Sequence, residues 1–264
     1  MTRTVQQLFD LKGRVALVTG GSRGLGLQMA RALGEAGARL MLSARKADEL
    51  KRAVAELQDA GIDARWIAAD AAREADIHRL ADETLERMGD VDILVNNAGA
   101  TWGAPAEDYS LEAWDKVMNL NVRGYFLLSQ RLGKASMIAC RRGRIINVAS
   151  IAGLGGNPPA AMQTIAYNTS KGAVINFTRA LASEWGRYGV TVNAICPGFF
   201  PSKMTRGTLE RLGEDAVAAH VPLLRLGDDE DLKGITLLYA SDAGKHITGQ
   251  WLAVDGGQSA VVGG

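Results

Sequence analysis

Residues 14–26 of the chain read Arg14-Val15-Ala16-Leu17-Val18-Thr19-Gly20-Gly21-Ser22-Arg23-Gly24-Leu25-Gly26. A short apolar run, typical of a buried strand, leads directly into a glycine-rich turn. Apolar residues then recur at helical spacing, so the turn opens a helix whose first N–H groups lack a partner within the helix. Such a helix end attracts anions, and glycine lets a pyrophosphate approach the backbone. An ordinary tight turn is the alternative, but a strand before it and a helix after it favour a nucleotide-binding turn.

The alternation of strand and helix patterns continues along the 264 residues. We expect strands near 14–19, 38–43, 64–69, 91–95, 143–149, 190–195 and 251–254, and helices at about 24–36, 46–60, 74–88, 111–139, 161–187 and 230–240. This order predicts an α/β fold, a Rossmann-type doubly wound parallel sheet of about seven strands with helices on both faces. No linker rich in Pro, Gly or Ser divides the chain, so we expect a single domain over residues 1–264.

Composition argues against several classes of protein. Hydrophobic residues make up 47% and charged residues 22%, which is ordinary for a globular protein. With 30 basic and 29 acidic side chains the net charge is +1, so we expect neither nucleic acid nor an anionic membrane as a partner. No apolar run reaches the roughly 18 residues of a membrane span. The N-terminus lacks the apolar core of a signal peptide, so the sequence predicts a cytoplasmic protein.

Cysteines and histidines are few and scattered. Cys140 and Cys196 cannot form a disulfide framework, and we expect both to be small buried side chains. His78, His220 and His246 lack the spacing of metal ligands, so no catalytic metal is expected.

A tyrosine and a lysine stand four residues apart, at Tyr167 and Lys171. On a helix they share one face, so the ammonium should lie near the phenol ring. A nearby cation is expected to lower the tyrosine pKa from about 10 toward the working pH, as proton-transfer catalysis requires. A surface lysine four residues after a tyrosine is common on helices. The pair therefore becomes informative only together with Ser150, which follows an apolar strand, and with the glycine turn.

Taken together, these motifs resemble those of the short-chain dehydrogenase/reductase family. The turn has the spacing Gly-x-x-x-Gly-x-Gly instead of the Gly-x-Gly-x-x-Gly of the commoner dinucleotide fold. Asn-Asn-Ala-Gly at 96–99, Ser150, Tyr167 with Lys171, and Pro-Gly at 197–198 then follow in the family's order. The resemblance covers about residues 11–257. It implies an oxidoreductase that interconverts a ketone and a secondary alcohol by hydride transfer.

The resemblance also implies the catalytic roles. Ser150 and Tyr167 would hydrogen-bond the substrate oxygen, Tyr167 would transfer the proton, and Lys171 would lower the tyrosine pKa and bond the nicotinamide ribose. Asn121 corresponds to the family asparagine that holds a water beside the lysine. Asn119 is rejected, because only Asn121 fits the pattern Asn-x-x-Gly.

A cofactor-binding set follows from the same resemblance. It comprises Gly20, Ser22, Arg23, Gly24, Leu25, Gly26, Ser43, Arg45, Asp70, Ala71, Asn97, Ala98, Gly99, Tyr167, Lys171, Pro197, Gly198, Phe200 and Ser202. Asp70 resembles the aspartate that accepts from the adenine amino group. Asn97 is expected to tie adjacent strands, to present its backbone to the adenosine ribose, or to do both.

The end of the second strand bears on the choice of nicotinamide cofactor. A carboxylate there would accept from the ribose hydroxyls of NAD and repel the 2′-phosphate of NADP. This chain has Ala44 at that point, followed by Arg45. Ser43, Arg45 and Arg23 can cradle a phosphate through charge-assisted bonds. We predict that NADP(H) is preferred over NAD(H), the alternative being that Arg45 and Lys46 are solvated residues at a helix start.

Two segments are expected to set the substrate. Tyr167 follows Ser150 by 17 residues, more than the usual family spacing, so residues 155–163 form an enlarged loop beside the site. Its Asn157, Met162 and Gln163 either contact the substrate or are solvated. Residues from about 200 to 226 are expected to form a lid. The apolar wall of that lid comprises Met204, Leu209, Leu212 and Val217.

The substrate is expected to be a small-molecule carbonyl or alcohol. The run 198–205 is similar to that of bacterial members labelled gluconate 5-dehydrogenase or 3-oxoacyl-[acyl-carrier-protein] reductase, and both activities stay open. The rival class is a non-catalytic dinucleotide-binding regulatory protein, which has no need of the complete catalytic set.

Assembly is inferred from the resemblance. A homotetramer, or a dimer, would form through the helices after the fourth and fifth strands and through the C-terminal strand at 251–257. Those helices carry the apolar residues Phe126, Leu127, Ile138, Phe177, Leu181 and Trp185, and the tail at 260–262 is apolar as well.

Overall fold

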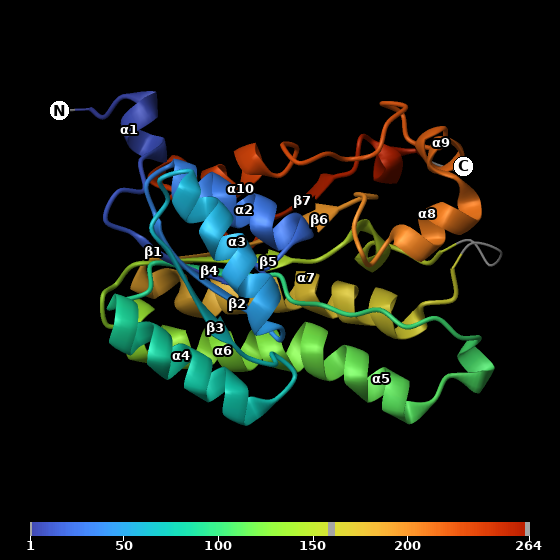
Figure 1. The fold of residues 1–264 in the computed structure, drawn as a ribbon, viewed down its shortest axis with the longest axis horizontal. Coiled ribbons are helices and arrows are strands. Elements are labelled where there is room, and N and C mark those ends of the chain that lie inside the picture. The colour runs from blue at the N-terminus through green and yellow to red at the C-terminus, as the bar shows by residue number, and fades with distance from the viewer. Residues whose placement is uncertain (1, 158–161, 262–264) are drawn as a thin grey trace.

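The computed structural model describes residues 2–157 and 162–261, and these contain one parallel sheet of seven strands (Figure 1). The strands are β1 (Val15–Thr19), β2 (Arg39–Ala44), β3 (Ala64–Ala68), β4 (Ile93–Asn96), β5 (Gly143–Val148), β6 (Val190–Pro197) and β7 (Trp251–Val254). Their order across the sheet is β3-β2-β1-β4-β5-β6-β7. The predicted doubly wound sheet is confirmed.

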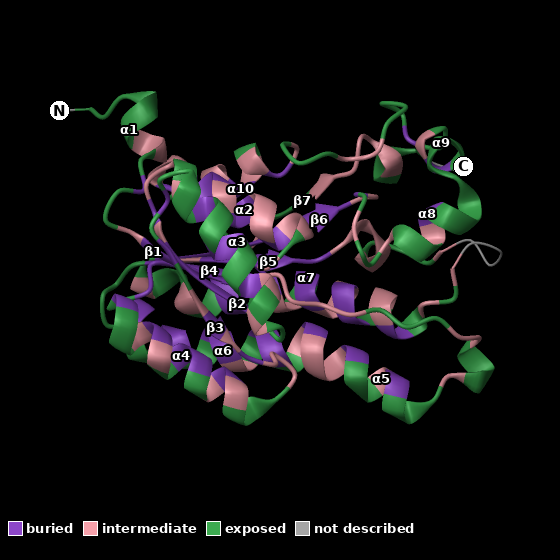
Figure 2. Ribbon diagram, viewed as in Figure 1, coloured by how far each residue is buried: buried purple, intermediate pink, exposed green. Residues whose placement is uncertain are grey.

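Helices cover both faces of the sheet (Figure 1). One layer contains α2 (Gly24–Glu35), α3 (Ala47–Asp59) and α10 (Lys233–Ala240), and the other contains α4 (Glu74–Met88), α6 (Gly124–Leu132) and α7 (Ile165–Trp185). Each helix turns a buried face to the sheet and a more exposed face outward, as Figure 2 shows by the change of colour around the helices.

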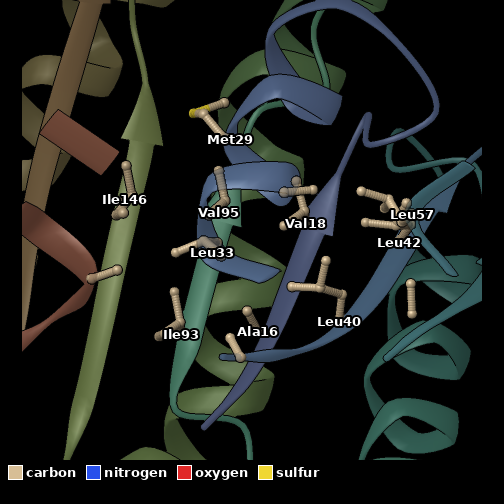
Figure 3. Close-up of a cluster of buried hydrophobic side chains, with 14 of the residues drawn as sticks. Ala16, Val18, Met29, Leu33, Leu40, Leu42, Leu57, Ile93, Val95 and Ile146 are labelled. Atoms are coloured by element: carbon tan, nitrogen blue, oxygen red, sulfur yellow. The ribbon is translucent and has the colours of Figure 1, made fainter. Parts of the chain in front are cut away.

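The strands supply side chains to both layers. In β1, Ala16 and Val18 pack toward α2 and α3, whereas Val15 and Leu17 pack toward α4 and α6. This alternation follows from the two-residue period of a strand. Figure 3 shows part of the first cluster, in which β1, β2 and β4 meet Met29 and Leu33 of α2. The central strands are therefore fixed by packing on both sides, and their ends are firm supports for a site.

The long helix expected over 111–139 is divided. It consists of α5 (Leu111–Met118), a π-helical turn η2 (Asn119–Arg123), α6, and a second π-helical turn η3 (Gly133–Met137). A π turn inserts one residue and rotates the side chains that follow, which is why such turns are frequent at functional sites. Helix α7 begins at Ile165, later than expected, and residue 161 lies outside the described residues.

Three short helices were not expected from the sequence: α1 (Val5–Phe9), α8 (Arg206–Leu212) and α9 (Glu214–Ala218). The signal for α1 was present, because Thr4 and Gln7 form a capping box at its start. Helices α8 and α9 lie in the segment expected to be a lid.

Two expectations about burial are wrong. Cys140 is exposed, because it lies in the turn that follows η3, and only Cys196 is buried. Leu181 packs into the core under the sheet and is not available to a partner. No helix in the described ranges is long and apolar enough to cross a membrane. Among those residues no group of three or more His, Cys, Asp and Glu is placed to hold a metal.

Candidate active site

The direction of chain winding reverses between β1 and β4, which are neighbours at the centre of the sheet. In open α/β sheets ligands bind outside the carboxyl ends of the strands at this switch point. The glycine turn follows β1, Asn97 follows β4, Ser150 follows β5 and Gly198 follows β6. The fold thus brings four of the predicted segments to one edge.

The glycine turn has the geometry that its sequence predicted. Gly20 and Gly24 adopt positive φ angles of 64° and 52°. A Cβ on Gly26 would lie 2.3 Å from the carbonyl oxygen of Gly20, so no other residue fits there. Arg23 precedes α2 without a side-chain cap, and the first N–H groups of the helix are left for a ligand. These residues fit the pyrophosphate of a dinucleotide.

Asn97 ties β4 to β1. Its Nδ2 donates to the main-chain oxygen of Thr19 at 2.9 Å, and its own N–H donates to Thr19 Oγ1 at 3.0 Å. Ala98 N–H also donates to Thr19 Oγ1, which in turn donates to the carbonyl of Val95. Asn97 therefore ties the two adjacent strands, which is one of the two roles expected of it. Thr19 was missed as its partner, because nothing in the sequence marks this threonine among the other strand residues.

Asn121 lies buried in the π-helical turn η2. Its Oδ1 accepts from Ala100 N–H, and its Nδ2 donates to Ala100 O and to Ser170 Oγ, each at 2.9 Å. All three bonds use the side-chain amide, so Asn121 fastens the loop after β4 to α7. A Cβ on Gly99 would lie 3.4 Å from Asn121 Oδ1 and 3.6 Å from Lys171 Nζ. The segment therefore brings the asparagine and the lysine to the same spot.

Helix α7 carries Tyr167 and Lys171 on one face, as their spacing predicts. Lys171 Nζ lies 5.6 Å from the ring centroid of Tyr167 and 5.7 Å from that of Tyr125. Its ammonium donates to the carbonyl oxygen of Val148, the last residue of β5, at 2.7 Å. Ser150 lies close enough to Tyr167 for its side chain to lower the pKa of the phenol. All four predicted catalytic residues are thus gathered at the ends of β4 and β5, while Val148 and Tyr125 were not foreseen.

The electrostatics of this pair differ from the sequence prediction. Burial raises the pKa of Tyr167, and the side chain of Ser150 offsets only part of that effect. Burial lowers the pKa of Lys171 from 10.5 to about 8. The expectation that Lys171 lowers the tyrosine pKa is wrong for this arrangement. Both groups have lost water, and desolvation disfavours the charged form of each.

The second strand ends as the sequence suggested. Ser43 is buried, Ala44 stands where an acid would favour NAD, and Arg45 is exposed. Within the described residues Arg45 makes no hydrogen bond or ion pair and is free to meet an anion. Arg23 is different, because its Nη1 lies 2.5 Å from Glu49 Oε2. Glu49 was not considered from the sequence.

Asp70 organises the turn after β3. Its Oδ1 accepts from Ala72 N–H at 3.1 Å, and its own N–H donates to Asp76 Oδ2 at 2.9 Å. Ala71 packs tightly below, since a Cβ on Gly124 would lie 2.3 Å from the Ala71 carbonyl oxygen.

The segment after β6 is held by a threonine that was missed. Thr205 Oγ1 donates to the carbonyl oxygen of Phe200 at 2.6 Å and lies 3.0 Å from Ser202 Oγ. The N–H of Ser202 donates to Thr205 Oγ1. A Cβ on Gly24 would lie 4.0 Å from Ser202 Cβ, so this segment faces the glycine turn. The Ser-x-x-Thr spacing was the available signal for such a turn.

The enlarged loop between Ser150 and Tyr167 is anchored to α7. Asn157 Nδ2 donates to Thr164 Oγ1 at 2.9 Å and lies 3.2 Å from Asn168 Oδ1. Gln163 contributes its carbonyl, which accepts from Ala104 N–H at 2.9 Å. Residues 158–161 of the loop lie outside the described residues, as does residue 262 of the tail.

The expected lid carries only part of the predicted apolar wall. Leu209 and Val217 are buried within the segment, whereas Met204 and Leu212 are exposed. The two buried residues hold α8 and α9 in place, and the exposed two are left to meet a ligand.

The fold and the site define an α/β protein with a glycine-rich anion-binding turn and a Ser-Tyr-Lys group at the switch point of its sheet. The family model for short chain dehydrogenase matches residues 14–212. The chain belongs to the short-chain dehydrogenase family.

Relatives and a solved structure agree over nearly the whole chain. A rhamnolipids biosynthesis 3-oxoacyl-[acyl-carrier-protein] reductase from Pseudomonas aeruginosa is 41% identical, covering 94% of this chain and 97% of the relative. A gluconate 5-dehydrogenase from Gluconobacter oxydans is 38% identical, covering 95% and 96%. The structure of a gluconate 5-dehydrogenase from Burkholderia cenocepacia in complex with NADP and tartrate has a TM-score of 0.91 and 34% identity, covering 98% and 100%.

Proposed function

We propose that the chain is an NADP(H)-dependent oxidoreductase that interconverts a ketone and a secondary alcohol. The observation that carries this proposal is the gathering of Ser150, Tyr167 and Lys171 at the same edge of the sheet as the glycine turn, with the ammonium of Lys171 5.6 Å from the centre of the Tyr167 ring. Hydride transfer needs a bound dinucleotide and a proton donor at the substrate oxygen, and this edge of the sheet has groups suited to both.

Each catalytic side chain has a task that its surroundings favour. Ser150 and Tyr167 hydrogen-bond the substrate oxygen, where negative charge develops during reduction. The raised pKa of Tyr167 keeps the phenol protonated at neutral pH, so it is ready to donate. Lys171 is held by Val148 and bonds the nicotinamide ribose. Asn121 is a positioning residue, since its amide is committed to Ala100 and Ser170. The nicotinamide, when bound, supplies or accepts the hydride.

NADP(H) is the cofactor that these residues favour. Arg45 is exposed and unpaired within the described chain, and Ala44 presents no carboxylate to repel a 2′-phosphate. The Burkholderia relative was solved with NADP. Ser22, Leu25, Asp70, Ala98, Pro197, Gly198 and Phe200 would complete the contacts along the dinucleotide. Comparison of the catalytic efficiencies with NADPH and NADH tests this assignment, and a clear preference for NADH would refute it.

A substrate with an apolar chain is favoured over a sugar acid. Trp102, Leu154, Ile165 and Met204 are 48%, 37%, 44% and 45% exposed, and each lies on a segment that also carries a site residue. Large apolar side chains left in solvent near a site mark a surface that a ligand covers. This favours a 3-oxoacyl substrate, as in the Pseudomonas relative, while gluconate oxidation stays the second candidate because of the Gluconobacter relative.

The decisive experiment is NADPH oxidation against a panel of 3-oxoacyl thioesters, simple ketones and 5-ketogluconate. Turnover of thioesters that rises with acyl chain length would support a substrate with an apolar chain, and turnover of the sugar acid alone would overturn that proposal. Silence on every substrate, with NADPH still bound, would favour the non-catalytic regulatory alternative.

Residues 1–264 would act as one domain, with the segment from about 200 to 226 as a lid over the substrate. A homotetramer, or a dimer, is the assembly we propose. Phe126 is 45% exposed and packs edge-to-face on Phe177, while Trp251 and Leu252 stand exposed on the edge strand β7. Light scattering on the Phe126→Asp variant tests the helical interface, since a charge there should dissociate it.

A further inference from the structure

Glu49 occupies a ready-made anion site. Its Oε2 lies 2.5 Å from Arg23 Nη1 and accepts from Ser22 Oγ at 3.5 Å, and its Oε1 lies 3.4 Å from Lys46 Nζ. Partial burial raises the pKa of Glu49, but Arg23, Lys46 and Lys203 together outweigh that effect, so the pKa is lowered. The side chain is therefore an ionised carboxylate held by three donors, and a third cation, Lys203, lies nearby.

The donors around Glu49 are the groups suited to the cofactor's second phosphate. Ser22 and Arg23 belong to the glycine turn, and Lys46 follows Arg45 at the start of α3. Guanidinium, ammonium and hydroxyl groups bind carboxylate and phosphate oxygens by the same charge-assisted hydrogen bonds. The carboxylate thus stands where one would expect a 2′-phosphate oxygen.

We propose that Glu49 is a specificity-determining residue that competes, within the chain, with the 2′-phosphate of NADP(H) for Arg23. This inference rests on the proposed function, since it presumes a bound dinucleotide. Two anions on one guanidinium repel each other, so a phosphate that binds Arg23 does so against the existing ion pair with Glu49. Glu49 therefore weakens NADP(H) binding and reduces the preference for NADP(H) over NAD(H). It also neutralises the charge of Arg23 and Lys46 when no cofactor is bound.

A purely structural role makes the opposite prediction. If Glu49 served only to hold Arg23 in place and to favour the first turn of α3, its removal would leave the guanidinium disordered and weaken phosphate binding. The sign of the change in affinity therefore separates the two roles.

The test is isothermal titration of the full chain with 2′,5′-ADP, which carries the second phosphate, and with 5′-AMP, which lacks it. Neither fragment has a nicotinamide, so the readout is binding and not turnover. We expect Glu49→Gln to bind 2′,5′-ADP about three- to tenfold more tightly than the wild type and 5′-AMP equally well. In the Arg23→Ala background the same substitution should give a smaller gain.

Glu56→Gln is the matched control. Glu56 lies two turns further along α3 and pairs with Arg31 of α2, so its substitution removes a similar ion pair of α3 at a distance from the glycine turn. It should leave both affinities unchanged. Unchanged or weaker 2′,5′-ADP binding by Glu49→Gln would overturn the inference while leaving the proposed function intact. Failure of the wild type to bind NADPH or either fragment would overturn both.

Discussion

The ammonium of Lys171 donates to the carbonyl oxygen of Val148 at 2.7 Å, so the catalytic lysine is fastened to the end of the strand that leads to Ser150. Its aromatic neighbours, Tyr167 and Tyr125, exclude water from it. Burial of this kind disfavours the charged form, and the single anchoring oxygen is a neutral acceptor. The lysine is thus poised to give up its proton far more easily than one in solvent.

The first prediction concerns stability and pH. The pKa of Lys171 is about 8 in the folded chain and 10.5 ordinarily, so the unfolded chain binds more protons between these values. Stability from this group is fully present above 10.5 and is lost as pH falls through 8. The difference between the two pKa values corresponds to about 3 kcal/mol in the free energy of unfolding. In urea unfolding, the wild type should lose stability relative to Lys171→Met between pH 10 and pH 7. A pH-independent difference would contradict this assignment.

The second prediction concerns proton transfer. Tyr167→Phe should lower the rate of ketone reduction by about 10²–10⁴-fold, because the phenol donates the proton to the substrate oxygen. NADPH binding, measured by the change in its fluorescence, should stay within about twofold, since the ring still packs beside Lys171. Tyr188→Phe, in the 3-10 turn that follows α7 (Gly186–Tyr188), is the control and should turn over normally. Equal activity of both variants would remove Tyr167 from the mechanism.

The third prediction concerns the choice of cofactor. Arg45 is exposed and unpaired in the described chain, so it can reach a 2′-phosphate without breaking an existing bond. Arg45→Ala should raise the KM for NADPH roughly tenfold or more and leave that for NADH unchanged. Arg52→Ala removes a cation further along α3, where its Nε donates to the carbonyl of Asp48, and should change neither value. A parallel rise in both KM values would mean that Arg45 acts on the fold and not on the phosphate.

Sequence reasoning could reach the parts of this molecule that repeat a local pattern. The turn at 20–26 could be foreseen because glycine spacing, the preceding strand and the following helix are all local. Tyr167 and Lys171 could be paired because a helix places residues four apart on one face. Thr19 and Glu49 could not, since each acts through a side chain brought to the site by tertiary packing.

The prediction that the pKa of Tyr167 is lowered was wrong for a related reason. Its neighbour was visible in the sequence, but the loss of water around both residues was not. Leu181 is a similar case. Its apolar character predicted burial, but the sequence did not show whether the core or a partner subunit would cover it, and it packs into the core.

The last prediction tests the local pattern directly. A Cβ on Gly26 would lie 2.3 Å from the oxygen of Gly20 and 2.5 Å from Asn97 Nδ2, and backbone atoms cannot move aside cheaply. Gly26→Ala should therefore lose about 1–3 kcal/mol of unfolding free energy in urea and bind NADPH more weakly, because it separates the glycine turn from the strand tie at Asn97. Gly234→Ala in α10 meets no atom within 4 Å and should gain up to about 1 kcal/mol, since alanine favours a helix. If the two variants unfold alike and bind NADPH alike, close packing of the turn has no part in cofactor binding.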